Sequence, residues 1–111
     1  MKFTSAAIAL PFILASQVTA ICPGSNFGIG NVQHLGGATN RWSVYDDTCN
    51  QVDGLTTSKD PCTEGIFGCT PPPVTFNRYT STFTGLIYNC RPDPNAGVCG
   101  SDPISVCCSN N

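Results

Sequence analysis

The chain carries eight cysteines in 111 residues, and all of them lie between positions 22 and 108. An even number of cysteines at this density is typical of small extracellular domains, in which disulfides compensate for a small hydrophobic core. A zinc site is the alternative, but the chain has no Cys-x2-Cys pair and only one histidine. The sequence therefore predicts no metal site and four disulfides, formed by Cys22, Cys49, Cys62, Cys69, Cys90, Cys99, Cys107 and Cys108.

The sequence leaves the pairing of these cysteines open, since eight of them can be combined in on the order of a hundred ways. A bond between the neighbours Cys107 and Cys108 is not expected, because it would be strained. Residues 104–108 have the composition of a strand, in which successive side chains point to opposite faces. We therefore expect Cys107 and Cys108 to link two different layers of the fold.

The first 20 residues have the features of a signal peptide. Lys2 gives a positive start, residues 6–15 are apolar, and Val18 and Ala20 occupy the two positions that a signal peptidase reads. A membrane anchor is the alternative, but it would need about 20 apolar residues. We expect cleavage after Ala20, so that residues 21–111 form a single domain that is secreted, monomeric and without a membrane anchor.

The charge of the mature chain excludes several classes of partner. Four basic residues stand against seven acidic ones, a net charge of −3, and the basic residues are Arg41, Lys59, Arg78 and Arg91. Nucleic acids and anionic lipids attract proteins that carry a cluster of positive charge. The expected partner is therefore an extracellular protein or a glycan, and not a nucleic acid.

Several segments are rich in β-branched and aromatic residues and are expected to be short antiparallel strands. In residues 41–45 the alternation places Trp42 and Val44 on one face of the strand, with Ser43 and Tyr45 on the other. No segment shows helical spacing over ten residues. The predicted fold is a small, mostly β, disulfide-rich domain with little or no helix.

Two longer segments need separate predictions. Residues 74–90 are too long for one strand, so a break is expected near Thr80, or a bulge at Gly85. Residues 50–73 contain several turn-forming pairs and are expected to be a loop held at its cysteines. The Thr70-Pro71-Pro72-Pro73-Val74 sequence within it predicts a stiff polyproline stretch.

The sequence does not predict a catalytic site. His34 is the only near-neutral acid–base group, and it is expected to be an ordinary surface histidine. The small secreted guanyl-specific ribonucleases of fungi are similar in size, charge and β content, but their pattern needs two histidines. Here only His34, Glu64 and Arg78 match its residue types. We therefore expect a protein without enzymatic activity or cofactor, with a ribonuclease-like hydrolase as the alternative.

One cluster has the composition of a binding site. Trp42, Tyr45, Asp46 and Asp47 combine aromatic rings with carboxylates, as sugar-binding surfaces do. The alternative is structural: a single Trp usually packs in the core of a small domain, and Asp46 and Asp47 have the character of turn residues. Both interpretations stay open at this point.

The short signal peptide, the eight cysteines and the Ile-Ser-Val-Cys-Cys ending resemble those of small secreted cysteine-rich proteins of filamentous fungi. Many proteins of this class are effector candidates of plant-associated species. The resemblance implies a protein that binds a partner outside the fungal cell, at a host interface. A protease inhibitor and a glycan-binding module are the further alternatives.

Overall fold

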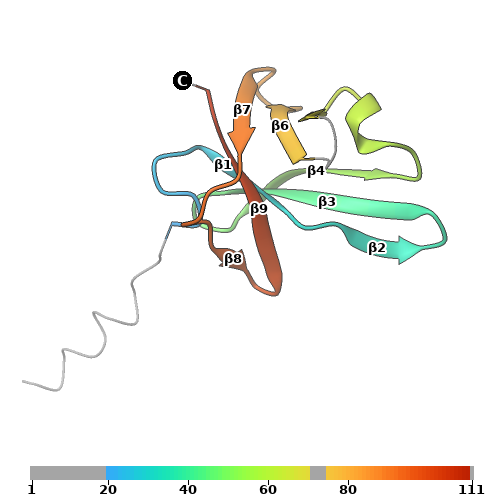
Figure 1. The fold of residues 1–111 in the computed structure, drawn as a ribbon, viewed down its shortest axis with the longest axis horizontal. Coiled ribbons are helices and arrows are strands. Elements are labelled where there is room, and N and C mark those ends of the chain that lie inside the picture. Colours follow the sequence, from blue (N-terminus) through green and yellow to red (C-terminus); the bar gives the residue numbers. More distant parts are fainter. Residues whose placement is uncertain (1–19, 71–74, 111) are drawn as a thin grey trace, which may run out of the picture.

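A computed structural model describes residues 20–70 and 75–110 of the chain (Figure 1). The predicted signal peptide lies outside these ranges, except for Ala20. The proline residues of the predicted polyproline stretch, Pro71 to Pro73, also lie outside them. Both predictions therefore stay predictions.

The described part of the chain forms β-strands and one short 3-10 turn, η2 (Pro61–Thr63), with no α-helix. The predicted small, mostly β, disulfide-rich fold is confirmed. The strands are β1 (Phe27–Gly30), β2 (Gln33–Gly36), β3 (Thr39–Asp46), β4 (Gln51–Thr57), β5 (Phe67–Thr70), β6 (Thr75–Thr80), β7 (Ile87–Arg91), β8 (Val98–Cys99) and β9 (Asp102–Ser109).

All strand pairs are antiparallel. The central order is β3-β1-β9-β7-β6-β5, with β2 and β4 also paired to β3 and the short β8 paired to β9. β3 has β4 along one edge, while its other edge pairs first with β2 and then with β1. In Figure 1 β9 crosses the middle of the molecule between β1 and β7.

The sheet curls around one main hydrophobic core, which we call the inner cluster. Its residues come from β1, β3, β5, β6, β7 and β9: Ile29, Val44, Phe67, Phe76, Tyr79, Tyr88, Cys90, Val106 and Cys108. A smaller outer cluster lies on the opposite face of β9 and consists of Ile21, Cys22, Cys99, Ile104 and Cys107. The aromatic residues of β5, β6 and β7 dominate the inner cluster, with Phe67 stacked on Phe76 at a ring distance of 4.6 Å.

The two adjacent cysteines of β9 belong to different clusters. Cys107 is bonded to Cys22 in the outer cluster, and Cys108 is bonded to Cys90 in the inner cluster. The prediction that these neighbours link two layers is confirmed. The remaining bonds are Cys49–Cys99 and Cys62–Cys69, and no cysteine is free.

The predicted loop over residues 50–73 is wrong in two places, because β4 and β5 lie within it. β4 contains Asp53 and Gly54, a pair that usually marks a turn. Here Gly54 fits a crowded strand position, since a Cβ on it would lie 2.6 Å from the guanidinium of Arg41. Tertiary packing against β3 thus overrides the local turn signal.

The predictions for residues 74–90 and for the strand over residues 41–45 are confirmed. The strand expected within residues 74–90 breaks after Thr80, and Gly85 has a φ of 76° in the turn that leads to β7. In β3, Trp42 and Val44 pack against the inner cluster, whereas Tyr45 packs against the outer one. The alternation of the sequence therefore identified the faces of β3 correctly.

Candidate functional site

The residues of the predicted binding cluster do not share one surface. Trp42 faces the inside of the curled sheet, and Tyr45 lies on its other face. The hydroxyl of Tyr45 donates a 2.7 Å hydrogen bond to Asp102. Burial and the contact with that carboxylate raise the pKa of Tyr45 above its ordinary value. The two rings therefore serve different parts of the fold.

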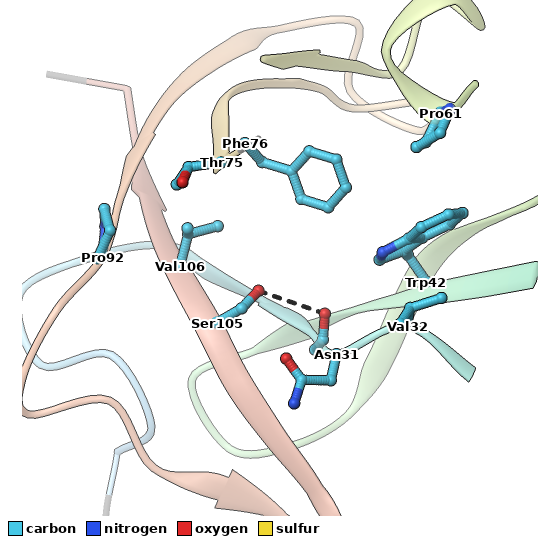
Figure 2. Close-up of a pocket in the computed structure, with 10 residues that line it drawn as sticks. Asn31, Val32, Trp42, Pro61, Thr75, Phe76, Pro92, Ser105 and Val106 are labelled. Atoms are coloured by element: carbon cyan, nitrogen blue, oxygen red, sulfur yellow. Dashed lines mark hydrogen bonds between the residues drawn. The ribbon is translucent and has the colours of Figure 1, made fainter. Parts of the chain in front are cut away.

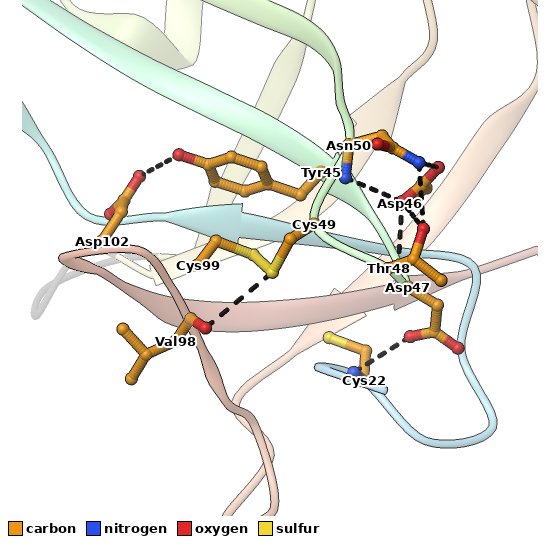
Figure 3. The surroundings of a disulfide bond; sticks show 10 residues. All are labelled: Cys22, Tyr45, Asp46, Asp47, Thr48, Cys49, Asn50, Val98, Cys99 and Asp102. Carbon is orange, nitrogen blue, oxygen red and sulfur yellow. Dashed lines mark hydrogen bonds between the residues drawn. A yellow bond between two sulfur atoms is a disulfide. The ribbon is translucent and has the colours of Figure 1, made fainter. Parts of the chain in front are cut away.

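Asp46 and Asp47 make structural contacts in the turn between β3 and β4 (Figure 3). The carboxylate of Asp46 accepts bonds from the backbone and side chains of Thr48 and Asn50. Burial works to raise the pKa of Asp46, but these hydrogen bonds outweigh it and hold the pKa below its ordinary value. Asp47 accepts a 3.0 Å bond from the backbone of Cys22. Both carboxylates thus hold the turn beside the Cys49–Cys99 bond.

Trp42 is the member of the predicted cluster that lines a pocket (Figure 2). The pocket has a volume of about 370 Å³. This volume lies within the range of small-molecule sites, about 300–1,000 Å³. The lining residues are Gly30, Asn31, Val32, Trp42, Pro61, Thr75, Phe76, Pro92, Ser105 and Val106.

One wall of the pocket is the bend between β1 and β2, where Asn31 and Val32 leave the sheet ladder. The backbone N–H of Asn31 donates a 2.8 Å hydrogen bond to the buried carboxylate of Asp102. Asp102 approaches Gly30 so closely that a Cβ at this position would lie 2.2 Å from its oxygen. Glycine is therefore required at position 30, and Asp102 fixes the bend from behind.

The floor of the pocket is set by a bulge between β1 and β9. Ile29 pairs with Val106 but Gly30 pairs with Ile104, so Ser105 is the extra residue. Its hydroxyl donates a 3.0 Å bond to the carbonyl of Ile29. It also lies 3.4 Å from the carbonyl of Gly30, and Figure 2 draws this second contact as a dashed line. The bulge turns Ser105 and Val106 toward the same pocket as Trp42.

Two aromatic rings form another wall of the pocket. The rings of Trp42 and Phe76 meet edge to face, with centroids 6.0 Å apart and planes at 77°. Phe76 is buried and is itself stacked on Phe67, so its ring is held in place. Figure 2 shows the indole nitrogen of Trp42 on the side of its ring that faces the pocket. The site is thus a mostly apolar hollow with the indole N–H as a donor in its aromatic wall, and with the polar side chains of Asn31, Thr75 and Ser105 elsewhere in its lining.

His34 lies exposed on β2, and its Nδ1 is 2.6 Å from the side-chain oxygen of Asn40. It does not line the pocket. The ribonuclease-like pattern has two other residues. Glu64 follows η2, Arg78 lies on β6, and neither lines the pocket. Among the described residues no group of three or more His, Cys, Asp or Glu side chains is arranged to hold a metal ion.

Sequence reasoning missed most of the pocket. Nothing in the sequence marks the bend at Asn31 and Val32 as part of a site, and nothing marks Ser105 as a bulge residue. Phe76 was recognised only as a strand residue. The one detectable signal was the single Trp beside polar residues, and it did identify Trp42.

The chain matches no protein family, and neither a curated protein nor a solved structure is significantly similar to it. No helix in residues 20–70 and 75–110 has the length and apolar character needed to span a membrane.

Proposed function

We propose that this protein is a secreted, effector-like binding protein without enzymatic activity, which acts outside the fungal cell by holding a ligand in the Trp42 pocket. The observation that carries the proposal is the lining of the pocket. Among the described residues, the lining holds aromatic and aliphatic side chains and the hydroxyls of Thr75 and Ser105, but no Asp, Glu, His, Lys, Arg or Cys. General acid–base catalysis needs such a group next to the substrate, and a hydroxyl acts as a nucleophile only when a base activates it.

The rigidity of the scaffold supports the same function. The bond between Cys90 and Cys108 lies in the inner cluster, next to Val106 of the pocket floor. The outer face of β9 is held by the bond between Cys22 and Cys107. A site that is formed before the ligand arrives loses little conformational entropy on binding. Four disulfides and the predicted signal peptide support secretion.

The test is the response of plant leaf tissue to purified protein in three forms: native, reduced and alkylated, and His34→Ala. The native and His34→Ala forms should act equally, because the proposal gives the imidazole no chemical role. The reduced form should be inactive, since without its disulfides a chain of this size does not keep its pocket. RNA and a panel of proteases are assayed in parallel.

Each alternative has its own result. Cleavage of RNA that is lost in a folded His34→Ala protein would establish the hydrolase and overturn the proposal. Inhibition of a protease would show that the protein acts as a protease inhibitor. A response that survives reduction and alkylation would show that a linear segment acts and that the folded pocket does not.

A further inference from the structure

Among the residues that the structure describes, the pocket has no charged side chain in its lining, and this limits what it can bind. Asp102 lies close to Gly30, but its two oxygens accept hydrogen bonds from Asn31 N and Tyr45 Oη. An ionic ligand would give up its hydration without meeting an opposite charge in the pocket, which is costly. The pocket therefore selects against ions.

Four of the described lining residues carry polar side chains: Asn31, Trp42, Thr75 and Ser105. The indole N–H of Trp42 donates only, and it has no hydrogen bond within residues 20–70 and 75–110. Every buried side-chain nitrogen in these ranges has a hydrogen-bond partner. The indole nitrogen has none, so it is not fully buried, and Figure 2 shows it on the side of the ring that faces the pocket. The hydroxyl of Ser105 is already used as a donor to the Ile29 carbonyl. The carboxamide of Asn31 both donates and accepts. The indole N–H is a donor set in the aromatic wall itself, where the acceptor oxygen of a ring-containing ligand can meet it.

The mostly apolar lining favours a ligand that is less polar than a sugar. A pyranose displays several hydroxyls, and each one that is buried without a partner costs free energy. The rings of Trp42 and Phe76 and the aliphatic side chain of Val106 offer carbon surface instead. Flat apolar molecules gain most from such walls, because the gain grows with the apolar area removed from water.

We propose that the pocket takes a small, uncharged, ring-containing organic molecule whose carbonyl or ether oxygen accepts a hydrogen bond from Trp42 Nε1. This inference rests on the proposed function and names the ligand class of the same site. The volume of about 370 Å³ suits one small molecule.

Four probes of similar size but different chemistry test the inference. Acetophenone is an aromatic ketone with one acceptor, and ethylbenzene has the same carbon skeleton without it. Benzoate is charged, and methyl β-glucoside is a sugar. Because Trp42 is the only Trp, the ¹H–¹⁵N spectrum holds a single indole N–H signal that reports on the pocket. Each probe is titrated to about millimolar concentration, where molecules of this size bind.

Acetophenone should shift the indole signal saturably, and ethylbenzene should bind about 5-fold more weakly, as loss of one hydrogen bond implies. Benzoate and the glucoside should leave the signal unchanged. In Trp42→Phe, saturation-transfer NMR should show equal affinity for acetophenone and ethylbenzene. Val32→Arg should block binding, whereas the matched control Val98→Arg, at an exposed residue of β8, should not.

Other results overturn the inference. A saturable shift with the glucoside or benzoate but none with acetophenone would assign a different ligand class, while binding as the function would stand. Equal binding of acetophenone and ethylbenzene to the native protein would remove the role of the indole N–H. No shift with acetophenone in the folded protein would also overturn the ligand class. The proposed function fails separately, through the His34-dependent cleavage described above.

Discussion

The hydroxyl of Tyr79 on β6 donates a 2.6 Å hydrogen bond to the carboxylate of Asp53 on β4. These strands lie toward opposite ends of the sheet order, with β3, β1, β9 and β7 between them. The same carboxylate oxygen accepts a bond from the backbone of Thr82 at the start of the β6–β7 turn. This pair therefore joins the two sides of the curled sheet and helps to hold it closed around the inner cluster.

Replacing Tyr79 by Phe removes this bond and leaves the ring in place. We expect the free energy of unfolding to fall by about 1.5 kcal/mol. This is the lower end of the range for a hydrogen bond to a charged group, and it applies because Thr82 still donates to Asp53 in the variant. Urea unfolding measures the change. Tyr88→Phe is the matched control, since the hydroxyl of Tyr88 has no hydrogen bond within the described ranges and its ring stacks on Tyr79. Equal losses in both variants would contradict the role of the Asp53 bond.

Acid should destabilise the protein through Asp53. Burial works to raise the pKa of Asp53, but the bonds from Tyr79, Thr82 and Gly54 outweigh it and hold the pKa below 3.8. A lowered pKa in the folded state means that the group stabilises the protein above pH 3.8 and that this stability is lost as the pH falls through the folded value. Urea midpoints between pH 7 and pH 2 should decrease below about pH 4–5. Asp53→Asn should show a shallower decrease, and an identical pH profile would contradict the prediction.

The four disulfides should contribute unequally. The bond Cys22–Cys107 closes a separation of 85 residues, and Cys62–Cys69 closes one of only 7. The entropy of loop closure gives about 4.5 kcal/mol for the first and about 2.5 kcal/mol for the second. Replacing each pair by Ser and measuring unfolding in guanidinium tests this order. Greater loss from the Cys62–Cys69 pair would contradict it.

The connectivity has a direct test. Partial reduction and cyanylation before digestion should show Cys107 joined to Cys22 and Cys108 joined to Cys90. Adjacent residues of β9 point to opposite faces, so the two cysteines bond to partners on different faces. A peptide in which Cys107 and Cys108 are bonded to each other would contradict the two-cluster architecture.

Gly30 should tolerate no side chain. A Cβ at this position would lie 2.2 Å from the carboxylate of Asp102, so Gly30→Ala has to displace Asp102 or the bend at Asn31. We expect a loss of about 1–3 kcal/mol, as overpacking usually costs, together with loss of acetophenone binding. Gly97→Ala is the control, because its nearest neighbours lie at ordinary contact distances of 3.4 Å or more. Thermal unfolding and the indole signal report both effects.

Local patterns in the sequence were sufficient for the fold class and for several elements. The alternation around Trp42 and Val44 identified the inner face of β3, and the adjacent Cys107 and Cys108 indicated two layers. Both features depend on the period of a strand, which is local. The sequence did not identify β4, because the Asp53–Gly54 pair usually forms a turn. The crowding of Gly54 against Arg41, which accounts for a glycine within the strand, depends on the pairing with β3.

The candidate site was less accessible to prediction, since it depends on contacts between distant segments. Asp102 lies 71 residues from Asn31 in the sequence, yet their hydrogen bond fixes the pocket wall. Tyr45 and Asp46 looked like partners of Trp42, but one lies on the other face of β3 and the other holds a turn. The register shift that exposes Ser105 to the pocket is likewise a property of pairing and not of composition.

The central claim is that the protein acts through the Trp42 pocket, and one comparison tests it most directly. Val32→Arg places a long charged side chain at the pocket, and Val98→Arg makes the same change at an exposed valine on β8. Both folded, oxidised variants are applied to plant leaf tissue beside the native protein. We expect the Val98→Arg protein to match the native response and the Val32→Arg protein to lose it. An undiminished response to Val32→Arg would contradict the claim that the pocket is the functional site.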